Sequence, residues 1–159
     1  MKGFITLDIP TKPYIKAYVL HKMGPAPKMV QSNSFISKKL YDLLQHETNR
    51  HGAVKISSMY TEKLRVYIPT DTYHRRGGNL NATNLKNFNG FLEDIIKHRF
   101  YELMDESMCI FDSFTQNLPD IRSKLGIDLE AWSDDSMKKD YYRYRKSLQK
   151  SLAKMSPQF

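Results

Sequence analysis

The segment LKNFNGFLEDIIKHRFYELMDE, residues 85–106, predicts the longest helix of this chain. Its apolar side chains recur at steps of three and four, which is the spacing of one face of an α-helix. Asn81 or Thr83 can cap the first turn, because each side chain carries an oxygen that accepts a hydrogen bond from a free backbone N–H. The side chains expected on the buried face are Leu85, Phe88, Leu92, Ile95, Ile96, Phe100, Leu103 and Met104.

Upstream of this helix, short strand-like and helix-like segments alternate and are separated by Pro and Gly. Thr11 can cap a helix that has Pro13 in its first turn, and Gly24 suits the end of that helix. Ser32, Asn33 or Ser34 can cap the helix that follows. The elements expected in order are a strand at 4–9, a helix at 13–23, an extended segment at 28–31 and a helix at 35–47.

Two further segments alternate apolar and polar side chains with the period of a β-strand. They are AVKISSMY at 53–60 and LRVYIP at 64–69, and only three residues lie between them. This short connection predicts a hairpin, whose second strand ends at Pro69. The residues that follow, 71–84, are expected to form a polar loop.

Downstream of the long helix, the sequence predicts only helices. Residues 119–125 form a short predicted helix that begins with a proline, with Asn117 near its cap. Ser133 then caps a second helix. Its first turn holds Asp134 and Asp135, where carboxylates suit the helix dipole.

These elements predict an α+β fold. We expect a small mixed body over residues 1–108, with short strands or a hairpin and the long helix. An all-helical, basic C-terminal subdomain is expected over 109–159. The length of 159 residues fits one domain with a helical appendage, and a hydrophobic fraction of 40% is enough for a core.

The charge balance is the strongest compositional indication of function. Lys and Arg number 25 against 17 Asp and Glu, which leaves a net charge of +8 and a pI near 9.5. Small basic proteins of this kind commonly bind a polyanion, most often nucleic acid and less often an anionic membrane or an acidic protein. The alternative interpretation is that the excess of positive charge serves only to keep the protein in solution.

Cys109 is the only cysteine, so the sequence excludes an internal disulfide and predicts a reducing, cytoplasmic environment. Its neighbours Met108, Ile110 and Phe111 are apolar and predict a buried thiol. The first nine residues lack the apolar region of a signal peptide. No stretch approaches the ~20 apolar residues of a membrane span.

Residues 137–155, MKKDYYRYRKSLQKSLAKM, hold most of the excess positive charge, with seven Lys or Arg against one Asp. On a helix, the apolar residues of this segment lie on one side and most basic residues on the other. The apolar stripe consists of Met137, Tyr141, Tyr144, Leu148, Leu152 and Met155. The basic face consists of Lys139, Arg143, Lys146, Lys150 and Lys154, with Tyr142 at its edge.

Such a helix can pack through its apolar stripe and present its basic face to phosphates, where cations displace counterions. Arg also forms bidentate hydrogen bonds with phosphate or guanine, and Tyr142 can stack on a base. A solvated amphipathic helix is the alternative, although solvated helices usually mix charges of both signs. The predicted nucleic-acid-binding residues here are Lys138, Lys139, Tyr142, Arg143, Arg145, Lys146, Lys150 and Lys154.

The order helix, Gly turn, helix over residues 119–146 resembles the helix-turn-helix layout of DNA-binding proteins, in which the second helix enters the major groove. Two features depart from that layout. The connection at 126–132 is longer than the usual three or four residues, and Asp134 and Asp135 occupy the helix start. We therefore expect the helix to dock by its middle and end. The chain as a whole is similar to small, basic, Tyr- and Asn-rich proteins of phages and mobile elements.

The segment YHRRGGNLN, residues 73–81, is a second candidate site. Arg75 and Arg76 precede two glycines just ahead of the long helix, and both a glycine backbone and a helix N-terminus favour an anion. The segment lacks the GxxxxGK[ST] and GxGxxG spacings of nucleotide-binding loops. An exposed turn is the alternative interpretation. If the C-terminal helix binds nucleic acid, Arg75 and Arg76 would extend the same positive track.

No pattern typical of an enzyme is present. The five His residues lack metal-ligand spacing, so neither a metal nor a cofactor is expected. Adjacent acidic pairs such as Glu93 and Asp94 point about 100° apart on a helix. The tyrosines at 141, 142 and 144 lack the His-x-His motif that accompanies the tyrosine nucleophiles of rolling-circle nucleases.

The sequence therefore predicts non-catalytic nucleic-acid binding, to DNA in preference to RNA, in a phage, mobile-element or chromosome-organising setting. The alternative is a structural or assembly protein, either a virion component or a complex subunit. In that case the basic helix would dock an acidic partner or form a homo-oligomer.

Overall fold

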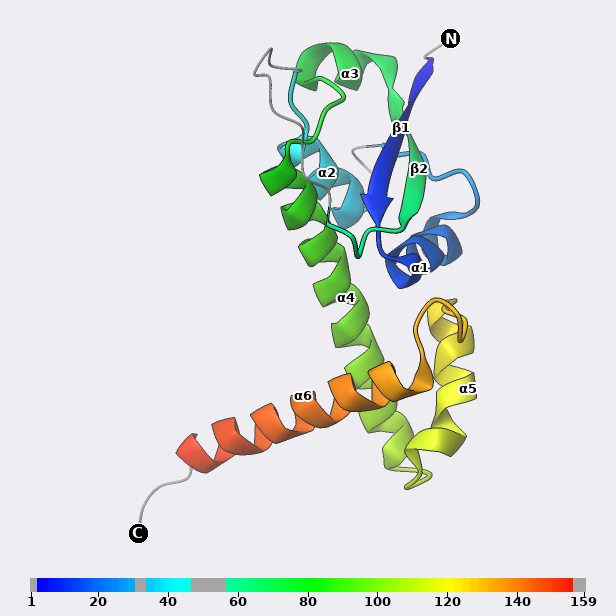
Figure 1. Cartoon of the computed structure of the whole chain (residues 1–159), viewed down its shortest axis with the longest axis vertical. Coiled ribbons are helices and arrows are strands. Elements are labelled where there is room, and N and C mark those ends of the chain that lie inside the picture. The colour runs from blue at the N-terminus through cyan, green and yellow to red at the C-terminus, as the bar shows by residue number, and fades with distance from the viewer. Residues whose placement is uncertain (1–2, 31–33, 47–56, 156–159) are drawn as a thin grey trace. The chain divides into compact units, whose positions relative to one another are not determined.

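The computed structural model describes residues 3–30, 34–46 and 57–155 (Figure 1). Within these ranges lie two strands and six helices, which confirms the predicted α+β class with a helical C-terminal region. In chain order they are β1 (Phe4–Thr11), α1 (Pro13–Met23), α2 (Phe35–Leu43), β2 (Glu62–Pro69), α3 (Thr70–Arg76), α4 (Ala82–Met108), α5 (Phe114–Leu125) and α6 (Asp134–Met155).

The chain divides into two compact units, residues 1–96 and 97–159. The division falls inside α4, whereas the sequence pattern places the boundary near residue 108. The first part of α4 therefore belongs to the N-terminal unit and its last part to the C-terminal unit.

The N-terminal unit is built on β1 and β2, which form an antiparallel pair. The register places Ile9 opposite Leu64 and Leu7 opposite Val66. Because successive side chains of a strand point to opposite faces, Ile9, Leu64 and Val66 are buried together while Arg65 is exposed. This burial fixes the register, since a shift by one residue would expose the apolar side chains.

The predicted hairpin is wrong for the part of the chain that the structure describes. The partner of β2 is β1, which lies some fifty residues upstream, and residues 57–60 form a turn. Residues 53–56 of the predicted first strand lie outside the described residues. An alternating pattern indicates a strand but not its partner, and here the apolar face of β1 supplies the partner.

The predicted cap Thr11 of the first helix is wrong, because the N-cap of α1 is Lys12 and has no side-chain cap hydrogen bond, whereas the other predicted ends of the first two helices are confirmed. Pro13 opens α1, and Gly24 ends it with a φ of 87°, a conformation that favours glycine. Ser34 caps α2, because its Oγ accepts a hydrogen bond from the N–H of Ser37 at 3.2 Å. The predicted helix was too long at its C-terminus, since α2 ends at Leu43.

The polar loop predicted after Pro69 is wrong in its first part, because Thr70–Arg76 forms the helix α3. Its sequence contains no apolar stripe, and Thr72 is its only buried residue. The helix therefore has no periodic signal in the sequence. The predicted cap of α4 is confirmed, since the Asn81 side chain accepts a hydrogen bond from the N–H of Asn84 at 2.7 Å.

Side-chain hydrogen bonds join β1 and the start of α1 to α4 within the N-terminal unit. Thr11 donates to the Asn89 side chain at 2.6 Å, and Asn89 in turn donates to the Pro10 carbonyl at 3.0 Å. The Lys12 ammonium lies 3.0 Å from the Glu93 carboxylate. These buried or half-buried polar groups are thus satisfied by one another.

The C-terminal unit packs the end of α4, α5 and α6 around Phe100, which is fully buried. The rings of Phe114, Trp132 and Tyr141 lie edge-on or tilted to Phe100, with centroids 5.3–6.4 Å away. Such aromatic pairs are stabilised beyond their buried area. The centre of this unit is therefore aromatic.

The start of α5 differs from the prediction. The helix begins at Phe114 and is capped by Ser113, whose Oγ accepts from the N–H of Gln116 at 3.3 Å. Pro119 therefore lies inside the helix. Phe114 and Leu118 are both buried and lie four residues apart, which places them on one face of the longer helix.

Cys109 was predicted to be buried, and that prediction is wrong. The thiol is exposed, as are its neighbours Ile110 and Phe111. These residues follow the last turn of α4, where the chain turns toward α5. An apolar run at the end of a helix thus lies on the surface.

Candidate nucleic-acid interface

The first turn of α6 is fixed to the end of α5. Ser133 caps α6 as predicted, accepting from the N–H of Ser136 at 3.3 Å. The Arg122 guanidinium forms an ion pair with Asp134 at 2.5 Å and donates to the Asp128 carbonyl at 2.9 Å. The Asp134 carboxylate at the start of α6 is therefore already paired with an arginine of the same unit.

Asp105 holds the middle of α6 against α4. The Tyr141 hydroxyl donates to one oxygen of Asp105 at 2.7 Å, and the Tyr144 hydroxyl donates to the other at 3.0 Å. Arg145 lies 3.5 Å from the same carboxylate. The Tyr144 ring also stacks on Tyr101, with centroids 4.3 Å apart and planes 7° apart.

These contacts shift the titration of both tyrosines. Burial raises the pKa of the Tyr141 hydroxyl, and the hydrogen bond to the negatively charged Asp105 raises it further. For Tyr144 the hydrogen bond to Asp105 is the main cause of a raised pKa, followed by desolvation. Both hydroxyls are therefore held as protonated donors.

The packing of the apolar stripe stops part-way along α6. Residues 134–144, here named the anchored half, contain Met137 and Tyr141, which are 0% and 3% exposed. Residues 145–155, here named the extended half, are all exposed. Along the stripe, exposure rises from 37% for Leu148 to 57% for Leu152 and 79% for Met155.

The basic face is exposed along its whole length. Within the described residues no ion pair joins Lys139, Lys146, Lys150 or Lys154 to a carboxylate. Arg143 lies 3.7 Å from Asp140, one turn earlier on the same helix. The remaining predicted residues have internal contacts, since Arg145 pairs with Asp105 and Lys138 lies 5.9 Å from the Tyr142 ring centre.

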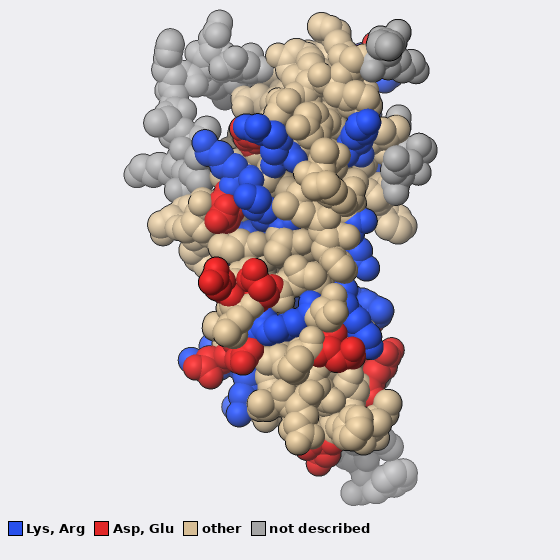
Figure 2. All heavy atoms as spheres, turned by 90° about the vertical axis from the view of Figure 1, so that its right-hand side faces the viewer, with Lys and Arg blue, Asp and Glu red and all other residues tan. Residues whose placement is uncertain are grey.

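Elsewhere, charges of both signs lie side by side on the face drawn in Figure 2 and in individual ion pairs. On the face drawn in Figure 2, Lys and Arg side chains lie beside Asp and Glu. Individual pairs include Arg65 with Asp8 at 2.8 Å, whose hydrogen bond lowers the pKa of Asp8, and Lys124 with Asp120 at 2.9 Å. In contrast, residues 141–155 of α6 contain five Lys or Arg and no acidic residue.

Arg75 and Arg76 lie on α3 in the N-terminal unit, not on a loop. Arg76 donates to the Tyr41 carbonyl at 3.2 Å and lies 3.9 Å from Asp42, so it holds α2. Arg75 donates to the Asp71 carbonyl at 3.4 Å.

The two glycines that follow also have an internal role. A Cβ on Gly77 would lie 2.2 Å from the Gln45 carbonyl oxygen, and one on Gly78 would lie 2.5 Å from the Tyr73 ring. Close approach of the protein's own chain thus accounts for both glycines.

Sequence reasoning missed Asp105 and Arg122, which position α6. Each is a charged residue on a helix with ordinary spacing, and nothing in its neighbourhood marks it. The signal lies in pairs: Tyr141 and Tyr144 carry hydroxyls on an apolar stripe, and a buried hydroxyl requires an acceptor. Asp105 on the long helix is an acceptor that meets this requirement for both tyrosines.

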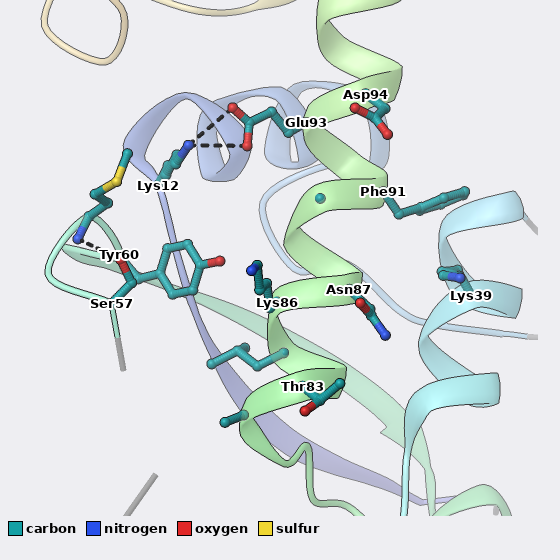
Figure 3. A pocket seen from close by; sticks show the side chains of 14 residues that line it. Lys12, Lys39, Ser57, Tyr60, Thr83, Lys86, Asn87, Phe91, Glu93 and Asp94 are labelled. Carbon is teal, nitrogen blue, oxygen red and sulfur yellow. Dashed lines mark hydrogen bonds and ion pairs between the residues drawn. The ribbon is translucent and has the colours of Figure 1, made fainter. Parts of the chain in front are cut away.

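A cleft of about 1120 Å³ lies in the N-terminal unit, along the exposed side of α4 (Figure 3). None of the predicted site residues lines it. Lys12 is occupied by Glu93, and the Lys39 ammonium lies 5.5 Å from the Phe91 ring centre. Tyr60 borders the cleft, and burial raises its pKa. The lining thus combines the cations Lys12, Lys39 and Lys86 with the carboxylates Glu93 and Asp94, whereas residues 141–155 of α6 contain no carboxylate.

In the described part of the chain, no group of three or more His, Cys, Asp or Glu side chains lies close enough to hold a metal ion. None of the helices described combines the length and apolar character of a membrane span. Comparison with protein-family models, curated proteins and solved structures found no match.

Proposed function

We propose that this protein binds nucleic acid, with duplex DNA as its main ligand, through the basic face of α6 and without catalysis. The observation that supports this proposal is the exposed row of Lys146, Lys150 and Lys154 on a helical segment without acidic residues. Residues four apart on a helix lie about 6 Å apart along its axis. The row therefore presents evenly spaced cations that can neutralise successive phosphates and release counterions.

The anchored half would set the direction in which these cations point. Asp105 and the aromatic centre hold α6 by Met137, Tyr141 and Tyr144, on the side opposite the basic face. Asp134 and Asp135 place carboxylates in the first turn of α6, where they repel phosphates, and Arg122 is already paired with Asp134. The middle and end of α6 would contact the ligand, consistent with the expected departure from a helix-turn-helix.

Duplex DNA is favoured over RNA on geometric grounds. The major groove of B-DNA is wide enough to admit a helix, whereas that of A-form RNA is deep and narrow. An exposed helix with cations on one side can therefore enter the major groove of B-DNA, but not that of A-form RNA. A phage, mobile-element or chromosome-organising context remains part of this proposal.

The test is the salt dependence of binding to a short labelled duplex, measured by fluorescence anisotropy between about 50 and 200 mM salt. With the unpaired cations Lys139, Lys146, Lys150 and Lys154 on four phosphates, log K should fall against log salt with a slope of about −3.6. The triple variant Lys146→Gln, Lys150→Gln, Lys154→Gln should lose about 2.7 of that slope.

A matched control removes the same charge elsewhere. Lys22, Lys38 and Lys63 are exposed residues of the N-terminal unit, and changing all three to Gln should leave the slope unchanged. Equal losses in both triple variants would show that net charge alone governs binding. Absence of binding at 50 mM salt would refute the proposal.

Docking of an acidic protein is the competing function, because it would use the same lysines. Poly-glutamate of matched charge is therefore titrated beside duplex DNA and RNA. Tighter binding to poly-glutamate than to DNA would favour the acidic partner, whereas a preference for duplex DNA supports the proposal.

A further inference from the structure

The extended half of α6 exposes a second surface that nucleic acid would not cover. Leu148, Leu152 and Met155 follow one another at steps of four and three, so they lie on one side of the helix. At 100° per residue, Lys146, Lys150 and Lys154 point away from them. A polyanion on the basic face would leave these three apolar side chains exposed to water.

The borders of this apolar segment are close to neutral. Ser147 and Ser151 lie along one border and Gln149 along the other, at helical angles of about 60–100° from Leu148. Two cations lie near a border: Arg145, which is paired with Asp105 at 3.5 Å, and Lys154, which lies about 100° from Met155 and further from both leucines. Unlike the basic face, this surface therefore carries little net charge.

We propose that a second copy of this chain covers the segment, so that two α6 helices pair through Leu148, Leu152 and Met155. Two identical surfaces with neutral borders meet without like-charge repulsion, because their lysines point outward. An acidic protein partner fits the segment less well. Carboxylates at the rim of its groove would need lysines beside Leu148, Leu152 and Met155, and most unpaired lysines lie on the opposite side of the helix. An anionic membrane favours cations beside the apolar side chains, where Ser and Gln stand.

An antiparallel pair fits the length of the extended half. Its eleven residues span about 16 Å. A two-fold axis near Leu152 would place Leu148 of one copy against Met155 of the other, in a self-complementary contact. The paired helices would then carry two basic faces directed outward. This last consequence rests on the proposed function, whereas the pairing itself does not.

The interface would be small. Three apolar side chains per helix fall below the ~1,000 Å² of a stable interface, so we expect a weak dimer with a dissociation constant on the order of 100 µM. With their basic faces directed to opposite sides, the two copies of a pair would contact two separate duplex segments. Contact through both faces should raise the apparent affinity for DNA above that of a single helix.

Disulfide crosslinking tests the pairing on the full chain. The native thiol is first removed by Cys109→Ser, because Cys109 is exposed. In that background, Leu152→Cys should form a crosslinked dimer under mild oxidation at least tenfold faster than the matched variant Gln149→Cys. Equal crosslinking rates at the two positions would overturn the proposal.

Sedimentation equilibrium of the unmodified protein provides a second measurement. The average mass should rise above 18.7 kDa with concentration, and Leu152→Glu should abolish the rise. The triple lysine variant should keep it, which separates failure of the pairing from failure of nucleic-acid binding. A mass independent of concentration, or one unaffected by Leu152→Glu, would contradict the pairing.

Discussion

The two halves of α6 have the same sequence pattern and different environments. Both carry apolar residues at steps of three and four and basic residues opposite. In the anchored half Met137 is fully buried, whereas in the extended half Met155 is 79% exposed. The difference arises from the rest of the unit, because the rings of Phe100 and Phe114 lie against Tyr141, which belongs to the anchored half. A stripe thus shows which side of a helix can be buried, not what buries it.

The largest expected effect comes from the matched methionines of the two halves. Met137→Ala should reduce the free energy of unfolding by about 2–4 kcal/mol, because it leaves a cavity in a packed core. Met155→Ala should change it by less than about 0.5 kcal/mol. Urea unfolding followed by Trp132 fluorescence measures both, since this only tryptophan is buried in the C-terminal unit.

A dimer would alter the second value, so these measurements use protein concentrations well below the expected dimer dissociation constant. Equal destabilisation by the two substitutions at such concentrations would show that the extended half is packed within the monomer. That result would remove the distinction between the two halves.

The sequence predicted the long helix α4 and the start of α6 well, the start of α5 less well and the strand pairing poorly. The stripe of α4 and the caps Asn81 and Ser133 are local signals, and the structure confirms them except for Ile95, which is only half-buried. The partner of β2 depends on contacts between residues more than fifty apart, which no local pattern encodes. The helix α3 was missed for a related reason, since its short polar sequence carries no apolar period.

The sequence was enough to predict which residues form the basic face of α6, but not which part of the helix is packed against the rest of the unit. The number of Lys and Arg residues and their helical spacing were enough to predict the basic face. The exposed state of Leu148, Leu152 and Met155 was not predicted, because a regular stripe suggests burial along its whole length. The role of Asp105 was also missed, since a single carboxylate on a long helix looks like any solvated residue until Tyr141 and Tyr144 are placed beside it.

A smaller effect is expected from Asp105→Asn, which weakens the attachment of the anchored half. The change removes the charge that accepts from Tyr141 and Tyr144 and that pairs with Arg145. We expect a loss of about 1–2 kcal/mol in the free energy of unfolding, measured as above.

The matched control is Asp120→Asn. Asp120 pairs with Lys124 across one turn of α5, and both side chains are more than half exposed, so the loss should stay below about 0.5 kcal/mol. Similar losses for the two substitutions would mean that Asp105 contributes no more than a surface ion pair.

The smallest effect is a pH dependence of the same attachment. Because burial and Asp105 raise the pKa of Tyr141 in the folded protein, the folded state keeps a proton that the unfolded state releases above about pH 10. The stabilisation is complete below that pH and is lost as the pH rises further. The loss cannot exceed about 1.4 kcal/mol per pH unit for one group.

Tyr141→Phe isolates this contribution. The free energy of unfolding is measured at pH 9 and at pH 11 for the wild type, for Tyr141→Phe and for Tyr142→Phe, the last at an exposed position in the same helix. The wild type and Tyr142→Phe should lose about 1 kcal/mol more than Tyr141→Phe between the two pH values. Parallel losses in all three proteins would show that the Tyr141 hydroxyl titrates alike in the folded and unfolded chains, and the anchored half would then lack its proposed hydrogen bond to Asp105.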